Sequence, residues 1–125
     1  MPHVLVAEDS SDDRDLFRTA LEIVGFTVTT AETTAGVLEA AWSASPPDVI
    51  LLDLVLDRDD GLALVRTLRE DARTAILPIV AITAATPLYV EAAALKVGCT
   101  AFLTKPCHPE VIFDTLRSAV RGRET

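Results

Sequence analysis

The sequence has few aromatic residues, few cysteines and no long apolar segment. Only 5% of its 125 residues are aromatic, although 50% are hydrophobic, so the core must consist mainly of Val, Leu, Ile and Ala. This composition is typical of buried parallel strands covered by alanine-rich helices. The high apolar fraction excludes an intrinsically disordered chain. The length suits one domain with a single core.

No apolar segment approaches the roughly 20 residues that a membrane-spanning helix requires. The first three residues lead directly into an apolar strand, without the regions of a signal peptide. We therefore expect a soluble protein that stays in the cytoplasm and has no membrane partner. The two cysteines, Cys99 and Cys107, lack the spacing of a zinc site. We expect them to be small hydrophobic residues rather than a disulfide, and we assign them no chemistry.

Basic residues are also scarce. The chain has 11 Lys and Arg residues against 19 Asp and Glu, a formal net charge of -8, and a pI near 4.6. Such a surface repels phosphate backbones and has no basic patch for nucleic acid. We therefore expect no direct binding of nucleic acid by this chain.

Five short apolar segments alternate with five segments of helical periodicity. The predicted strands cover residues 3–7, 26–30, 49–52, 78–82 and 100–103, and the second of them alternates as an edge strand does. In the first helical segment, a stripe of four residues is predicted to be buried: Phe17, Ala20, Leu21 and Val24. Gly25 and Gly98 stand where a helix ends in a left-handed residue. This alternation predicts a doubly wound α/β fold with a parallel sheet and helices on both faces.

Polar residues follow four of the predicted strands. Glu8 and Asp9 follow the first, Asp53 the third, Thr83 ends the fourth, and Lys105 follows the fifth. In an open α/β sheet, ligands bind at the carboxyl ends of the strands. Each residue alone has an ordinary explanation as a helix cap, a loop acid or a turn residue. Their occurrence at one edge of the sheet favours a shared site.

Three carboxylates at one edge favour binding of a hard divalent cation with oxygen ligands, and Mg²⁺ is the natural choice. A carboxylate held on such a cation can attack phosphorus and form an acyl phosphate. The metal and Lys105 would neutralise the charge that develops on the phosphoryl oxygens. The residues alone therefore predict Mg²⁺-assisted phosphoryl chemistry.

Four motifs together resemble the receiver domain of two-component response regulators, over nearly all of the chain. They are residues 4–9, residues 51–54 with Asp60-Gly61, residues 82–84, and residues 102–106. The resemblance implies a flavodoxin-like five-stranded sheet of order 2-1-3-4-5 with five helices. It implies a receiver domain over residues 1–122 and a tail at 123–125. The expected function is a signalling switch, not an ordinary enzyme, that receives a phosphoryl group from a histidine kinase or phosphotransfer protein.

The resemblance also implies roles for single residues at the phosphoryl site. Asp53 is the expected phosphoacceptor, and Lys105, Thr83 and the backbone N–H of Ala84 are expected to contact the phosphoryl oxygens. The expected Mg²⁺ ligands, direct or through water, are Glu8, Asp9, Asp53 and the carbonyl of Val55. Together these groups would also assist phosphorylation and dephosphorylation of the domain itself.

The resemblance implies a switch outside the phosphoryl site. Thr83 and Phe102 are its expected switch residues, and the Lys105–Pro106 peptide bond is expected to be cis. Phosphorylation would draw Thr83 inward and let Phe102 turn, which changes the face formed by the fourth helix, fifth strand and fifth helix. A downstream protein, an output domain or a phosphorylation-dependent homodimer would bind there.

Two positions depart from the family or influence its chemistry. Asp57 stands where the family often has a proline, and Ala85 is a small residue at a position that affects phosphoryl lifetime. The main alternative is a degenerate receiver that binds proteins without phosphorylation, although every reactive group is retained. A haloacid-dehalogenase-type phosphohydrolase would need an acid where Val55 stands. A flavodoxin-like cofactor or nucleotide binder would need a glycine-rich or hydroxyl-rich phosphate loop.

Overall fold

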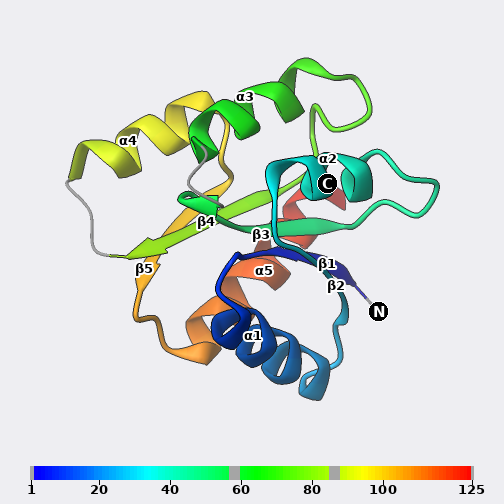
Figure 1. Cartoon of the computed structure of the whole chain (residues 1–125), viewed down its shortest axis with the longest axis vertical. Helices are drawn as coiled ribbons and strands as arrows, with labels where there is room; N and C mark the ends of the chain where they lie inside the picture. The colour runs from blue at the N-terminus through cyan, green and yellow to red at the C-terminus, as the bar shows by residue number, and fades with distance from the viewer. Residues whose placement is uncertain (1, 57–59, 85–87, 125) are drawn as a thin grey trace.

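The computed structural model describes residues 2–124 apart from 57–59 and 85–87. Within these residues, a parallel sheet lies between two layers of helices (Figure 1). The strands are β1 (His3–Ala7), β2 (Thr27–Ala31), β3 (Val49–Asp53), β4 (Ile79–Ala84) and β5 (Ala101–Lys105). The helices are α1 (Ser11–Ile23), α2 (Thr34–Ala41), α3 (Gly61–Glu70), α4 (Leu88–Val97) and α5 (Pro109–Glu124). The strand order is β2-β1-β3-β4-β5, which confirms the predicted order and the edge position of β2.

Short polar side chains start the helices next to the carboxyl ends of the strands. Ser10 caps α1 by accepting a hydrogen bond from the backbone of Asp13, and Asp60 caps α3 by accepting one from Leu62. Such caps satisfy backbone N–H groups that have no partner inside the helix. Gly25 and Gly98 have φ angles of 102° and 121°, as predicted, because a residue without a Cβ adopts this conformation most easily.

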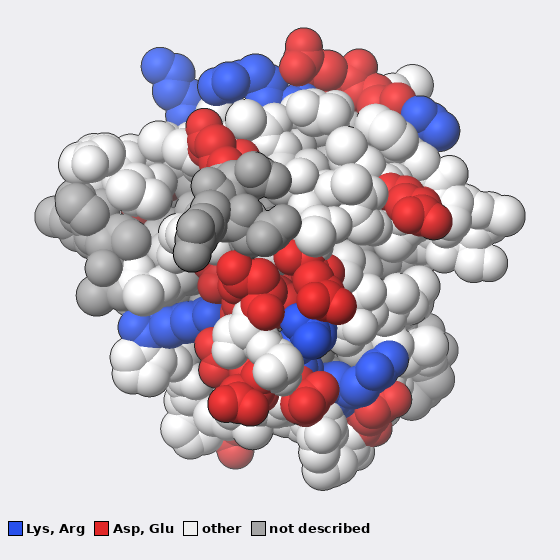
Figure 2. Space-filling model, viewed as in Figure 1, with Lys and Arg blue, Asp and Glu red and all other residues white. Residues whose placement is uncertain are grey.

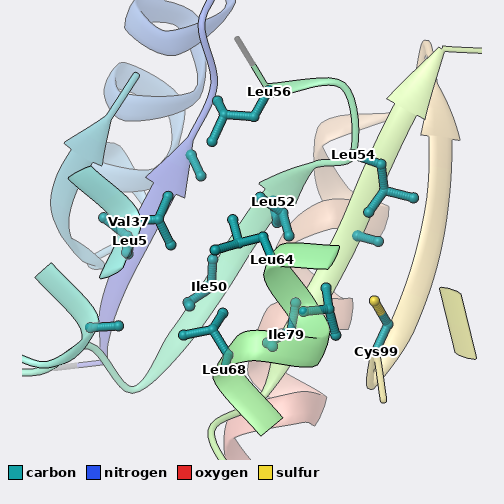
Figure 3. Packing of buried hydrophobic residues seen from close by; sticks show 14 of the residues in the cluster. Leu5, Val37, Ile50, Leu52, Leu54, Leu56, Leu64, Leu68, Ile79 and Cys99 are labelled. Atoms are coloured by element: carbon teal, nitrogen blue, oxygen red, sulfur yellow. The ribbon is translucent and has the colours of Figure 1, made fainter. Parts of the chain in front are cut away.

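Alternate residues of the central strands face two separate cores. The core beneath α2, α3 and α4 includes Leu5, Ile50, Leu52 and Ile79 from the sheet. Figure 3 shows these side chains together with those of Val37, Leu64 and Leu68 from the helices. The core beneath α1 and α5 is built from the intervening strand residues and from the helices, among them Val4, Val6, Val49, Leu51, Val80, Ile82, Leu21, Ile112 and Leu116.

The structure differs from the sequence prediction in a few places. Val24 was predicted to be buried, which is wrong: it follows α1 as the C-cap and is 36% exposed, whereas Phe26 is buried. β4 and β5 run two residues further than predicted because Thr83 and Ala84 pair with Thr104 and Lys105. Residues 123 and 124, which belong to the predicted tail, continue α5. In the described ranges, no helix is both long and apolar enough to cross a membrane.

Arg69 holds together the end of the sheet opposite the strand carboxyl ends. Its guanidinium donates hydrogen bonds to the carbonyl of Gly98 from Nε and Nη2, at 3.0 and 2.8 Å, and to the carbonyl of Leu77 from Nη1 at 2.6 Å. Nη1 also reaches the carbonyl of Thr74 at 3.0 Å. Burial lowers the pKa of the guanidinium. One side chain of α3 thus joins the segment before β4 to the turn before β5.

Substitution Arg69→Met is expected to lower the free energy of unfolding by about 3 kcal/mol, because several carbonyls lose a charged donor while the apolar stem is retained. The matched control is Arg66→Met, at an exposed position of the same helix, which is expected to change it by less than about 0.5 kcal/mol. Urea unfolding followed by circular dichroism measures both. Equal effects of the two variants would contradict a special role of Arg69.

Candidate functional site

The side chain of Lys105 lies among three carboxylates at the carboxyl edge of the sheet. Its Nζ is 2.9 Å from Oδ2 of Asp53 and 3.3 Å from Oδ2 of Asp13, and it forms an ion pair with Oε1 of Glu8. These residues come from β5, the end of β3, the first turn of α1 and the end of β1. Figure 2 shows acidic side chains gathered around a basic one near the middle of the visible face.

The alternation of side chains along the strands explains why these groups meet. Glu8, Asp53 and Lys105 continue the residue sets of β1, β3 and β5 that face α1 and α5. β4 lies between β3 and β5, so Lys105 must extend across it. Its register partner on β4 is Ala84, whose small side chain leaves room for the lysine to cross.

The local backbone orients the carboxylate of Asp53. Oδ1 accepts a hydrogen bond from the N–H of Val55 at 2.9 Å, while Oδ2 accepts the one from Lys105. The N–H of Gly61 donates to the carbonyl of Leu54, the residue after Asp53, at 3.0 Å. A Cβ on Gly61 would lie only 2.4 Å from that carbonyl oxygen. The glycine of the Asp60-Gly61 motif is therefore required by this close approach.

Burial shifts the pKa values of the charged groups in the site. Glu8 is 2% exposed and Asp53 is 8% exposed. Burial raises the pKa of Glu8, and the hydrogen bond from Lys105 opposes this shift. For Lys105, burial alone would lower the pKa, but the hydrogen bonds to Glu8 and Asp53 outweigh it and raise the pKa. The ammonium therefore stays charged, and three carboxylates around one cation leave an excess of negative charge.

The structure does not place all the predicted residues in this cluster. Asp9 is exposed, and Val55 is 59% exposed beside Asp53. Thr83 is buried and belongs to the set of β4 residues that faces α3 and α4, as Phe102 does on β5; Phe102 is half-buried against that core. The Lys105–Pro106 peptide bond is cis. Asp57 and Ala85 lie outside the described residues.

Sequence reasoning missed Asp13 as a site residue. Its carboxylate nevertheless pairs with the ammonium of Lys105. The signal that could have identified it is its place in the first turn of the helix that directly follows Glu8 and Asp9. A helix that begins at the carboxyl end of a strand presents its first turn to the site above that strand.

The carboxylates of Glu8 and Asp53 fit the oxygen ligands that Mg²⁺ prefers. Among residues 2–56, 60–84 and 88–124, no group of three or more His, Cys, Asp or Glu side chains is arranged to hold a metal ion. Glu8 and Asp53 nevertheless share a cation, the ammonium of Lys105. Mg²⁺ is usually held by one or two carboxylates together with waters. A metal ion bound by these two residues would have to compete with that ammonium.

Substitution Lys105→Met is expected to destabilise the fold by about 2 kcal/mol near neutral or alkaline pH, because Glu8 loses the cation that offsets its burial. In this variant, the pKa of Glu8 in the folded state rises further above the ordinary value of 4.5. A protonated Glu8 stabilises the fold at low pH, and this contribution is lost as the pH rises through the folded-state pKa. The difference in the free energy of unfolding between Lys105→Met and the wild type should thus shrink as the pH falls from about 8 to about 5.

Urea unfolding at a series of pH values measures this dependence. Lys96→Met, at an exposed position of α4, is the matched control because it removes the other lysine of the chain. It should show no such pH dependence. A deficit of Lys105→Met that is independent of pH would contradict the role assigned to the ion pair with Glu8.

Comparisons with known proteins found relatives of similar sequence and fold. The chain is 38% identical over 122 residues to the KDP operon transcriptional regulatory protein KdpE of Escherichia coli, covering 97% of this chain and 52% of that protein. It is 32% identical over 122 residues to the DNA-binding dual master transcriptional regulator RpaA of Synechocystis sp., covering 97% of this chain and 50% of that protein. The chain thus spans about half the length of these curated relatives.

Solved structures and a family model complete the comparison. The chemotaxis protein CheY4 of Vibrio cholerae matches with a TM-score of 0.86 and 29% sequence identity, covering 95% of this chain and 98% of that one. The family model of the response regulator receiver domain matches residues 4–117. That range contains β2 to β5, all of β1 except His3, and all the residues of the Lys105 cluster. This chain therefore belongs to the response regulator receiver domain family.

Proposed function

We propose that this receiver domain accepts a phosphoryl group on Asp53 from the phosphohistidine of a histidine kinase or phosphotransfer protein, in a reaction that depends on Mg²⁺. The observation that carries the proposal is the position of Asp53. Its carboxylate ends a central strand, is oriented by the N–H of Val55 and lies 2.9 Å from the ammonium of Lys105. Membership of the receiver family supports the same chemistry.

In the proposed step, a carboxylate oxygen of Asp53 forms a bond to phosphorus while the P–N bond of the donor breaks. The electron pair of that bond returns to the imidazole nitrogen of the donor histidine. Lys105 neutralises charge on a phosphoryl oxygen, and the backbone N–H of Ala84 donates to another. When bound, Mg²⁺ would supply further positive charge, with Glu8, Asp9, Asp53 and the carbonyl of Val55 as its proposed ligands.

We further propose that Thr83 and Phe102 transmit the phosphorylated state to the face formed by α4, β5 and α5. Both lie on the side of the sheet opposite Lys105, on neighbouring strands, with Ala81 paired to Phe102 and Thr83 to Thr104. A hydroxyl drawn toward a phosphoryl group on Asp53 would leave space for the half-buried ring to turn inward. A downstream protein, an output domain or a second copy of the chain would read this change.

Three further expectations stay predictions. The name of RpaA says that it binds DNA, and RpaA is about twice as long as this chain. DNA binding by such a longer protein is compatible with an acidic receiver domain. We still predict no binding of nucleic acid by these 125 residues, from the net charge of -8. A cytoplasmic location and a phosphorylation-dependent homodimer also follow from the sequence and its resemblance.

The wild-type protein is expected to gain one phosphoryl group from acetyl phosphate in the presence of Mg²⁺, measured by intact-protein mass spectrometry. Asp53→Asn should gain none, because an amide is not a nucleophile toward phosphorus. Asp15→Asn, an exposed acid of α1, is the matched control and should be labelled as the wild type is. Chelation of Mg²⁺ should abolish labelling. Absence of labelling in the wild type would favour a degenerate receiver.

Beryllofluoride, which mimics the phosphoryl group, is expected to shift the backbone amide NMR signals of α4, β5 and α5 in the wild type. In Thr83→Ala, the mimic should still bind near Asp53, but shifts at Phe102 and in α4 should fall to less than about half, because the hydroxyl that couples the two is missing. Ser118→Ala, an exposed hydroxyl of α5, should behave as the wild type. Unchanged shifts in Thr83→Ala would contradict the proposed switch.

A further inference from the structure

The three carboxylates around Lys105 differ in burial and in proximity. The side chains of Glu8 and Asp53 are 2% and 11% exposed. Both carboxylates lie within hydrogen-bonding distance of Nζ of Lys105. Asp13 is 45% exposed and 3.3 Å from Nζ. Since an exposed, longer ion pair is weakened by solvent, Asp13 is the weakest of the three partners.

The three ion-pair partners of Lys105 also differ in their proposed roles. Glu8 and Asp53 are proposed ligands of Mg²⁺, and the ammonium shares both of them in this structure. A divalent cation that binds these two carboxylates competes with the ammonium for them. Asp13 is the only one of the three described partners of Lys105 that is not a proposed metal ligand.

We infer that Asp13 is a positioning residue that holds the ammonium of Lys105 at the edge of the site when Mg²⁺ takes over Glu8 and Asp53. This inference rests on the proposed function of the site. The carboxylate retains the ammonium close to Asp53, so the lysine is available when phosphoryl oxygens arrive. Because the pair with Asp13 is exposed and long, a phosphoryl group can take the lysine from it at little cost.

Asp13 has a second, purely structural role from which this one must be separated. It lies with Asp12 in the first turn of α1, where negative charge stabilises a helix N-terminus. Asp12 is exposed in the same turn and is not among the ion-pair partners of Lys105 in the described ranges. Asp12→Asn therefore removes the same charge from the same turn without removing a partner of Lys105.

The test is an NMR titration with Mg²⁺ that measures the dissociation constant in the wild type, Asp13→Asn, Asp12→Asn and Asp13→Glu. Asp13→Asn should raise the dissociation constant about fivefold, because the displaced ammonium has no carboxylate left to pair with. Asp12→Asn should raise it less than about twofold, through screened charge alone. Asp13→Glu keeps a carboxylate and should recover most of the wild-type affinity. Circular dichroism checks that each variant is folded.

A double-mutant cycle with Lys105→Met decides whether Asp13 acts through the lysine. Lys105→Met alone should tighten Mg²⁺ binding, because a competing cation is gone. In that background, Asp13→Asn and Asp12→Asn should have equal effects. A larger effect of Asp13→Asn that persists without the lysine would overturn the inference, as would equal effects of the two variants in the wild-type background.

The proposed function fails in a different way. If the wild type gains no phosphoryl group from acetyl phosphate and its NMR signals do not respond to Mg²⁺, both the proposed function and this inference are wrong. If the wild type is labelled on Asp53 and binds Mg²⁺, but Asp13→Asn matches Asp12→Asn, only the role of Asp13 is wrong.

Discussion

The site depends on the ion pairs that Lys105 forms with Glu8 and Asp53 by extending across β4. Glu8 and Asp53 are nearly buried carboxylates at the ends of neighbouring strands, and such groups are costly to bury unless a cation pairs with them. Lys105 supplies that cation from β5, two strands away from β3. The arrangement holds two nearly buried carboxylates beside one cation.

Much of the surrounding structure positions these groups. The small side chain of Ala84 leaves a path for the lysine, and Gly61 lets the chain pass close to Leu54 just after Asp53. At the opposite end of the sheet, Arg69 joins the segments that precede β4 and β5 through their carbonyls. The strands that carry Thr83 and Lys105 are thereby held at their start, at the end of the sheet opposite the Lys105 cluster.

In the proposed function, the two faces of the sheet separate phosphoryl chemistry from signalling. Glu8, Asp53 and Lys105 lie toward α1 and α5, whereas Thr83 and Phe102 lie toward the core of α2, α3 and α4. In that proposal, the end of β4, where Thr83 lies, links a change at Asp53 to the second face. This geometry is consistent with a family whose relatives join the same domain to further sequence of similar length.

The sequence by itself determined the elements, their order along the chain and the gathering of Glu8, Asp53 and Lys105 at one edge of the sheet. Periodicity, caps and turn glycines are local signals, so the strands were predicted to within two residues. The tertiary structure alone decided which acids share Lys105, that Asp13 is one of them, and that Val24 is exposed. These outcomes depend on how α1 packs against the sheet and on the path of one side chain across β4, which no local pattern encodes.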